Sequence, residues 1–98
     1  MKTQREYINI LKKNTSKIRK DFGIKSLCLF GSVARNEQKE NSDVDICVTM
    51  DANPFLRIRV KEYLEHILSS PVDVVREHNN MNRFLKEQIH KDAIYIFK

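Results

Sequence analysis

Residues 25–50 read KSLCLFGSVARNEQKENSDVDICVTM, and this stretch decides the fold. Its first part, residues 25–30, is short and apolar and is followed by Gly31, which predicts a buried strand that enters a tight turn. Its last part, residues 43–50, alternates between polar and apolar residues and then becomes apolar, which predicts a second strand. Because only a short polar connection separates the two strands, we expect them to form an antiparallel pair.

Helices and further strands are expected on both sides of this stretch. Apolar residues at near-helical spacing predict a helix over about residues 3–20, with Gly23 placed to end it. Asn53 followed by Pro54 is typical of a helix start, and this helix is expected to run to about Ser69. The remaining expected elements are a short helix at 32–36, a polar loop at 37–42, a strand at 72–75, a helix capped by Asn79 or Asn80, and a last strand at 93–97.

The order of these elements predicts an α/β (α+β) fold with a mixed sheet of about four strands and helices packed on it. A chain of 98 residues predicts a single domain over residues 1–98. Its composition, 41% hydrophobic and 32% charged, is that of a globular protein and excludes a disordered one.

The net charge of +5 favours anionic partners such as nucleotides, nucleic acid or an acidic protein face, although it also serves solubility. Lys and Arg are scattered and form no dense tract, so nucleic-acid binding is not indicated. No apolar stretch follows the N-terminus and no run reaches membrane-spanning length, so we expect a cytoplasmic protein without a signal peptide or membrane span.

The cysteines and histidines do not predict a metal site. Cys28 and Cys47 both lie within apolar runs, where a thiol acts as a small hydrophobic side chain, so we expect both in the core. His66, His78 and His90 lack metal-ligand spacing and are expected to be surface or partly buried structural residues.

Asp43 and Asp45 are the first candidates for chemistry. Separated by one residue on a predicted strand, they point to the same face of the sheet. Two such carboxylates repel each other unless a cation or proton lies between them, and hard oxygen ligands of this kind suit Mg²⁺. The alternative is a solvated pair at the start of an edge strand.

Asp73 is the third candidate, because it lies between valines on another predicted strand, where a carboxylate without a partner is costly to bury. It either joins Asp43 and Asp45 from a neighbouring strand, completing a three-carboxylate metal site, or it points to solvent or pairs with Arg76. The residue types alone leave these alternatives open.

Gly31 and Ser32 are candidates for binding a phosphate group. A glycine after a strand lets the backbone approach a phosphate closely, and Ser32 adds a hydroxyl near the first N–H groups of a helix. No P-loop pattern is present. Arg35, one helical turn further, can either neutralise phosphate charge or pair with a surface acid such as Glu37.

The combination of these motifs is more specific than any of them. GSVAR at 31–35, SDVDI at 42–46 and the ten residues between Ser32 and Asp43 resemble the signature of the DNA polymerase β-like nucleotidyltransferase superfamily. The Gly-Ser-x-Ala-Arg form and the short length resemble its minimal nucleotidyltransferase (MNT) antitoxin family, and VDVV at 72–75 is similar to that family's third carboxylate strand. The resemblance covers about residues 24–76 and also fits the last strand. One departure is Asn36, where many relatives carry glycine, which affects the geometry of the nucleotide loop but leaves the carboxylates intact.

The resemblance implies a palm-like core and a role for each motif residue. Gly31 and Ser32 would hold the triphosphate of ATP or another nucleoside triphosphate. Asp43 and Asp45 would bind two Mg²⁺ ions, with Mn²⁺ as an alternative, and Asp73 would complete the metal site and help to deprotonate the acceptor hydroxyl. The reaction would transfer a nucleoside monophosphate, AMP in particular, to that hydroxyl.

A chain of this length supplies a catalytic core and little more, so the resemblance implies that a partner provides the acceptor. In the minimal family this partner is a HEPN-domain toxin, which some antitoxins adenylylate on a tyrosine. Two alternatives remain: a non-catalytic antitoxin that neutralises its partner by binding, and a nucleotidyltransferase that acts on RNA or a small molecule.

Overall fold

The computed structural model describes residues 2–98, and one mixed sheet of four strands organises them. The strands lie in the order β3-β2-β1-β4, with bounds β1 Ser26–Phe30, β2 Val44–Thr49, β3 Val72–Arg76 and β4 Ile94–Phe97. β1 pairs antiparallel with both β2 and β4, whereas β2 and β3 are parallel. The expected antiparallel first pair and the mixed α+β sheet are therefore confirmed.

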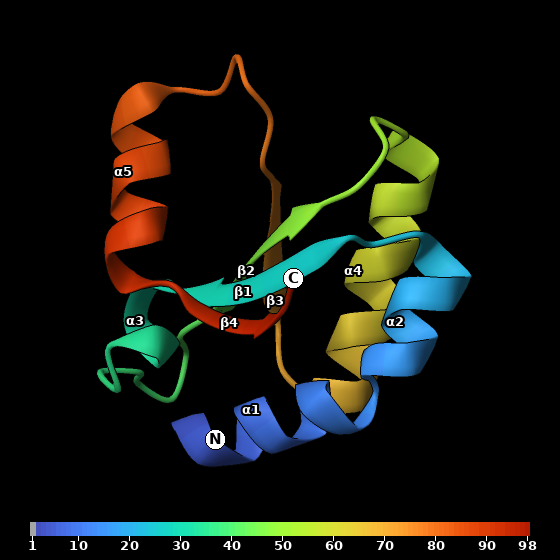
Figure 1. Cartoon of the computed structure of the whole chain (residues 1–98). Coiled ribbons are helices and arrows are strands. Elements are labelled where there is room, and N and C mark those ends of the chain that lie inside the picture. The colour runs from blue at the N-terminus through green and yellow to red at the C-terminus, as the bar shows by residue number, and fades with distance from the viewer. Residues whose placement is uncertain (1) are drawn as a thin grey trace.

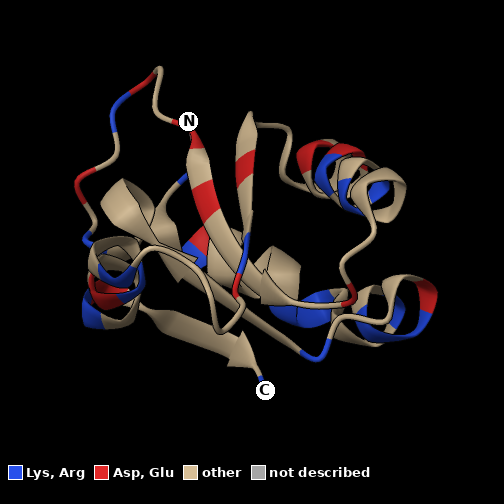
Figure 2. Cartoon of the chain, turned by 90° about the horizontal axis from the view of Figure 1, so that it is seen from above, with Lys and Arg blue, Asp and Glu red and all other residues tan. Residues whose placement is uncertain are grey.

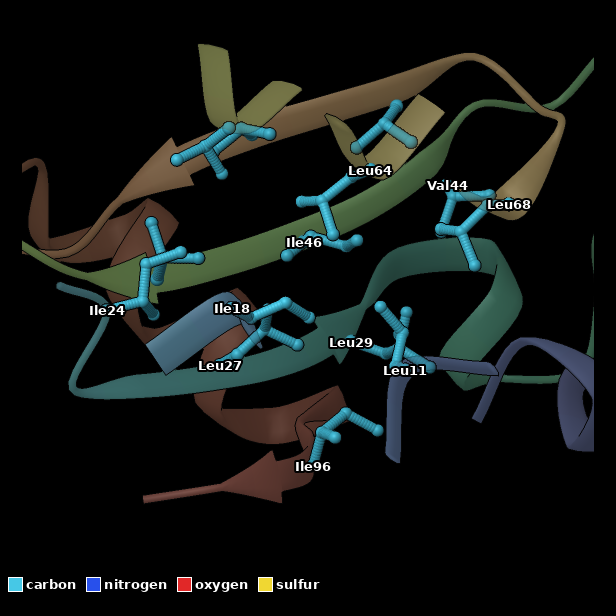
Figure 3. Packing of buried hydrophobic residues seen from close by; sticks show 14 of the residues in the cluster. Leu11, Ile18, Ile24, Leu27, Leu29, Val44, Ile46, Leu64, Leu68 and Ile96 are labelled. Carbon is cyan, nitrogen blue, oxygen red and sulfur yellow. The ribbon is translucent and has the colours of Figure 1, made fainter. Parts of the chain in front are cut away.

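Helices pack on both faces of this sheet (Figure 1). The larger core lies between the sheet and three helices, α1 Gln4–Lys13, α2 Thr15–Phe22 and α4 Pro54–Leu68. Alternate strand residues point into it and are at most 1% exposed, namely Leu27, Leu29, Val44, Ile46 and Val48 (Figure 3). On the other face, α5 Arg83–Asp92 covers part of the sheet, and the short helix α3 Gly31–Ala34 follows β1 directly.

A smaller apolar cluster lies under α5. Cys28 and Cys47 face each other across β1 and β2 and pack with Ile89, which confirms both thiols as buried core residues. α5 contacts β1 on this face, and α3 contacts both β1 and β2. No helix within residues 2–98 is long and apolar enough to cross a membrane.

The expectation of one helix over residues 3–20 is wrong, because the chain breaks at Asn14 into α1 and α2. The Asn14 side-chain amide donates to the Ile10 carbonyl (2.8 Å), and its side-chain oxygen accepts from the Tyr63 hydroxyl (3.1 Å). An asparagine that bonds to nearby backbone in this way competes with helix continuation. The second helix ends where expected, since Gly23 adopts the left-handed conformation (φ 65°) after Phe22.

The N-cap residue was predicted correctly for α4 but not for α5. Asn53 caps α4 as expected, and its side chain accepts from the Leu56 N–H (3.1 Å). The expected cap of α5 at Asn79 or Asn80 is wrong, because Asn82 accepts from the Leu85 N–H (3.0 Å) and the preceding residues form a turn. All three asparagines are equally suited to capping, so only the observed start of the helix distinguishes them.

Replacing Asn82 with alanine should lower the free energy of unfolding by about 1 kcal/mol, because the first turn of α5 loses its side-chain acceptor. In a domain of this size that corresponds to a fall in Tm of about 4–8 °C. Thermal unfolding followed by circular dichroism measures the change. Asn79→Ala, an exposed residue of the same loop, is the matched control and should leave Tm unchanged; equal losses in the two variants would contradict the assignment of the cap.

Candidate functional site

Three carboxylates, Asp43, Asp45 and Asp73, lie at or just before the first residues of β2 and β3. Val44 and Ile46 point into the large core, so Asp43 and Asp45 point to the opposite face of the sheet. On β3 the core-facing residues are likewise valines, which directs Asp73 to the same face as Asp45. Asp45 and Asp73 are direct partners in the parallel register, and Figure 2 shows acidic bands side by side on the neighbouring strands. The structure therefore places Asp45 and Asp73 side by side, with Asp43 close enough for its charge to act on Asp45.

The electrostatics of Asp45 reflect its burial and the charges of its neighbours. Burial, and then the negative charges of Asp73 and Asp43, together raise the pKa of Asp45 to about 6, while the positive charge of Arg35 opposes them. Asp45 is half-buried, whereas Asp43 and Asp73 are exposed. Two like charges close enough to disfavour ionisation mark a place where a cation would be stabilised.

Gly31 packs directly on this group. It has a left-handed backbone (φ 70°), and a Cβ atom placed there would lie 2.2 Å from Oδ2 of Asp45. Only glycine combines this conformation with this contact. The turn after β1 therefore brings Gly31 against the Asp45 carboxylate and is followed by the half-buried Ser32, an order that suits a phosphate group next to a cation.

Arg35 forms the ion pair that the sequence left open, and a second one besides. Its Nε donates to Glu37 (3.1 Å), and its Nη1 donates to Asp92 at the end of α5 (2.6 Å). Its influence on Asp45 places its charge near the carboxylates as well. Nothing in the sequence pointed to Asp92, because it lies far along the chain and meets Arg35 only when α5 folds back over α3.

The donor set fits a hard divalent cation that takes further ligands from a substrate. Within residues 2–98, no three or more His, Cys, Asp or Glu side chains converge closely enough to hold a metal ion by themselves. Mg²⁺ in phosphate-transfer sites is commonly held by one or two carboxylates together with substrate phosphates. The repulsion that Asp73 and Asp43 exert on Asp45, and the close approach of Gly31 to Asp45, agree with such a shared site.

The histidines have no part in this arrangement. His90 pairs with Glu77 (Nε2 to Oε1, 2.6 Å), and His66 and His78 are exposed, as expected for surface or structural residues.

This fold and this site define a nucleotidyltransferase, and comparison with known proteins agrees. The chain belongs to the polymerase beta nucleotidyltransferase family, whose model matches residues 7–98. A protein of Methanocaldococcus jannaschii, provisionally named a protein adenylyltransferase, is 39% identical over 98% of this chain and 100% of its own length. The protein adenylyltransferase MntA of Thermococcus cleftensis is 34% identical and covers 98% of both chains.

Solved structures share the same fold. One described provisionally as a minimal nucleotidyltransferase superposes with a TM-score of 0.78, at 29% identity and over 95% of each chain. Another holds a tri-AMPylated HEPN toxin of Shewanella oneidensis in complex with an MNT antitoxin; it has a TM-score of 0.66 at 20% identity and covers 92% of this chain and 71% of its own. The resemblance to the minimal nucleotidyltransferases is thereby confirmed.

Proposed function

We propose that this protein transfers AMP from ATP to a tyrosine hydroxyl of a HEPN-domain toxin and thereby acts as its antitoxin in the cytoplasm. One observation carries the catalytic part: Asp45 faces Asp73 across neighbouring strands, while Gly31 packs on Asp45. The acceptor is supported by relatives named as protein adenylyltransferases that match nearly the whole chain. The partner is supported by a fold neighbour crystallised with an AMPylated HEPN toxin.

The chemistry is an in-line displacement at the α-phosphorus of ATP. The acceptor oxygen forms a bond to that phosphorus while the bond to the oxygen bridging the α- and β-phosphates breaks. The leaving pyrophosphate takes the electron pair, and Asp73 or water accepts the hydroxyl proton. Gly31 and Ser32 would hold the triphosphate, and Arg35 would exchange its exposed partner Glu37 for phosphate oxygens.

Asp43 and Asp45 would hold two Mg²⁺ ions, or Mn²⁺ in their place, and Asp73 would complete the set. When bound, such ions neutralise the charge that develops on the entering and leaving oxygens. The carboxylates of this chain would fix the positions of the ions and supply negative charge from one face of the sheet. Catalysis then rests on positioning and charge neutralisation, because phosphoryl transfer needs little covalent chemistry from the protein.

The test is to incubate the purified chain with Mg-ATP and the product of the adjacent gene, which the proposal expects to be a HEPN-domain protein, and to follow the intact mass of that product. We expect a gain of one or more AMP groups with the unmodified chain and none with Asp43→Asn. Asp51→Asn is the matched control, since Asp51 is an exposed carboxylate beyond the other end of β2, and it should transfer normally.

Each other outcome selects a different function. If the chain binds the HEPN protein tightly but transfers no AMP to it, the chain is an antitoxin that acts by binding alone and not an enzyme. If pyrophosphate is released only when RNA or a small hydroxyl compound is added, the acceptor is that RNA or small molecule and not a protein. AMP addition that survives Asp43→Asn would reject the assigned carboxylates.

A further inference from the structure

A cleft of about 500 Å³ runs along the outer edge of β3, between this strand and the first half of α4. Asp73 lies in its lining, so the cleft joins the carboxylate site directly. The other lining side chains include three cations, Arg57, Lys61 and Arg76, and the apolar Ile58. Arg57 and Lys61 are one helical turn apart on α4.

The three cations have no acidic partner in the part of the chain that the structure describes. The ion pairs found within residues 2–98 belong to Arg35, Arg83 and His90. Arg57 instead donates from Nη2 to the Val74 carbonyl (2.8 Å), and Arg76 donates from Nε to the Met50 carbonyl (3.0 Å). These bonds fix both guanidinium groups at the cleft and leave their charges uncompensated, which favours an acidic ligand.

Two backbone groups on the outer edge of β3 are already bonded to side chains. The Val72 N–H donates to the Glu65 carboxylate (3.0 Å), and the Val74 carbonyl is already bonded to Arg57. A sheet edge whose backbone groups are occupied in this way does not pair readily with another chain. A ligand in the cleft must therefore be recognised by its side chains and charge.

The place of the cleft in the sheet argues for an acceptor in it, rather than for ATP. Gly31 follows β1, Asp45 lies on β2, Asp73 lies on β3, and the cleft lies beyond β3. In-line displacement requires the attacking oxygen and the leaving pyrophosphate on opposite sides of the α-phosphorus. With the triphosphate at Gly31, the acceptor hydroxyl enters from the side of β3.

Two exposed apolar side chains lie in the first turns of α4. Ile58, which lines the cleft, is 55% exposed, and Phe55, three residues earlier on the same helix, is 81% exposed. Large apolar side chains exposed together beside a charged groove are typical of a protein-binding surface.

We propose that this cleft binds an acidic segment of the protein that accepts AMP. Its carboxylates would lie against Arg57, Lys61 and Arg76, an apolar side chain would pack on Phe55 and Ile58, and its hydroxyl residue would reach Asp73. This inference rests on the proposed function for the identity of the acceptor. Beyond that function, it predicts which surface of the chain recognises the acceptor, and it predicts that the residues around the modified hydroxyl are acidic.

The experiment measures binding of a fluorescent peptide that contains one tyrosine, one leucine and several aspartates, using anisotropy and no ATP. A second peptide carries lysines in place of the aspartates. We expect the acidic peptide to bind and the basic one to bind at least roughly tenfold more weakly. Lys61→Glu should weaken binding of the acidic peptide by roughly tenfold. Arg59→Glu is the matched control, because Arg59 is exposed on α4 but does not line the cleft, and it should bind like the unmodified chain.

Three results would overturn the inference: no binding of the acidic peptide up to about 1 mM, equal affinity for both peptides, or unchanged affinity in Lys61→Glu. A Lys61→Glu protein that binds the peptide normally but loses Mg-ATP would assign the cleft to the nucleotide instead. Peptide binding is measured in the absence of transfer. If the chain binds the acidic peptide but adds no AMP to its partner, the proposed role of the cleft stands and the proposed enzymatic function is rejected.

Discussion

The Asp45→Asn protein should transfer no measurable AMP and yet be more stable than the unmodified chain at pH 8. Asparagine keeps the size of the side chain but removes the charge that would hold a cation beside the phosphates, so we expect transfer to fall on the order of a thousandfold or more. The same change removes a charge that is partly buried and repelled by Asp73 and Asp43. One substitution should therefore separate activity from stability.

The direction of the stability effect follows from the pKa of Asp45, which is about 6 in the folded chain against an ordinary value of 3.8. Between these values the folded state binds more protons than the unfolded state, so stability falls as pH rises through about 6. Above that pH the ionised carboxylate destabilises the fold. After allowance for its partial exposure to solvent we expect about 1–2 kcal/mol.

Thermal unfolding in EDTA measures this effect. At pH 8 the Asp45→Asn protein should melt several degrees above the unmodified chain, since about 1 kcal/mol corresponds to about 4–8 °C in a domain of this size. The difference should vanish below pH 3.8, where Asp45 is protonated in both states. Asp51→Asn again serves as the control. A variant that melts lower than the unmodified chain at pH 8 would show that Asp45 is stabilised by its surroundings.

Addition of Mg-ATP should reverse the order of the two proteins. A ligand that binds only the folded state raises its stability in proportion to the logarithm of ligand concentration over Kd. The unmodified chain should gain stability with Mg-ATP, while Asp45→Asn gains little. A gain of equal size in both would place the nucleotide away from Asp45.

Local patterns were enough to predict the first half of this site. Gly31, Ser32, Asp43 and Asp45 lie within one strand–turn–strand stretch, so their proximity follows from the pairing of β1 with β2. Asp73 required more, because its place depends on β3 pairing parallel to β2 through the crossover helix α4. The residues alone left it open between solvent and the site, and the resemblance to a family favoured the site.

What the sequence did not predict depends on tertiary contacts. The break at Asn14 is supported by Tyr63, which lies on a helix far along the chain. The ion pair of Arg35 with Asp92 and the cleft between α4 and β3 arise when distant elements pack. Periodicity reports which face of an element is apolar, but it does not report which neighbours that face will meet.

Gly31→Ala should cost far more than the same change at Gly23, and the difference measures the contact between Gly31 and Asp45. Both glycines have left-handed backbones, with φ of 70° and 65°, so both variants incur a penalty of about 1–2 kcal/mol. A Cβ at Gly23 meets nothing within 4 Å, whereas a Cβ at Gly31 would lie 2.2 Å from Oδ2 of Asp45. Relieving that overlap should add about 1–3 kcal/mol.

Chemical denaturation of the two variants gives both free energies, and a third protein identifies the cause. In Gly31→Ala combined with Asp45→Ala the overlapping carboxylate is gone, so the excess cost of Gly31→Ala over Gly23→Ala should largely disappear, apart from any contact with the remaining Cβ. If the excess persists, the turn itself requires glycine. If Gly31→Ala is no less stable than Gly23→Ala, the turn moves away from Asp45 at little cost. Because the phosphate site of the proposed reaction needs this close approach, Gly31→Ala should also lose AMP transfer, whereas Gly23→Ala keeps it.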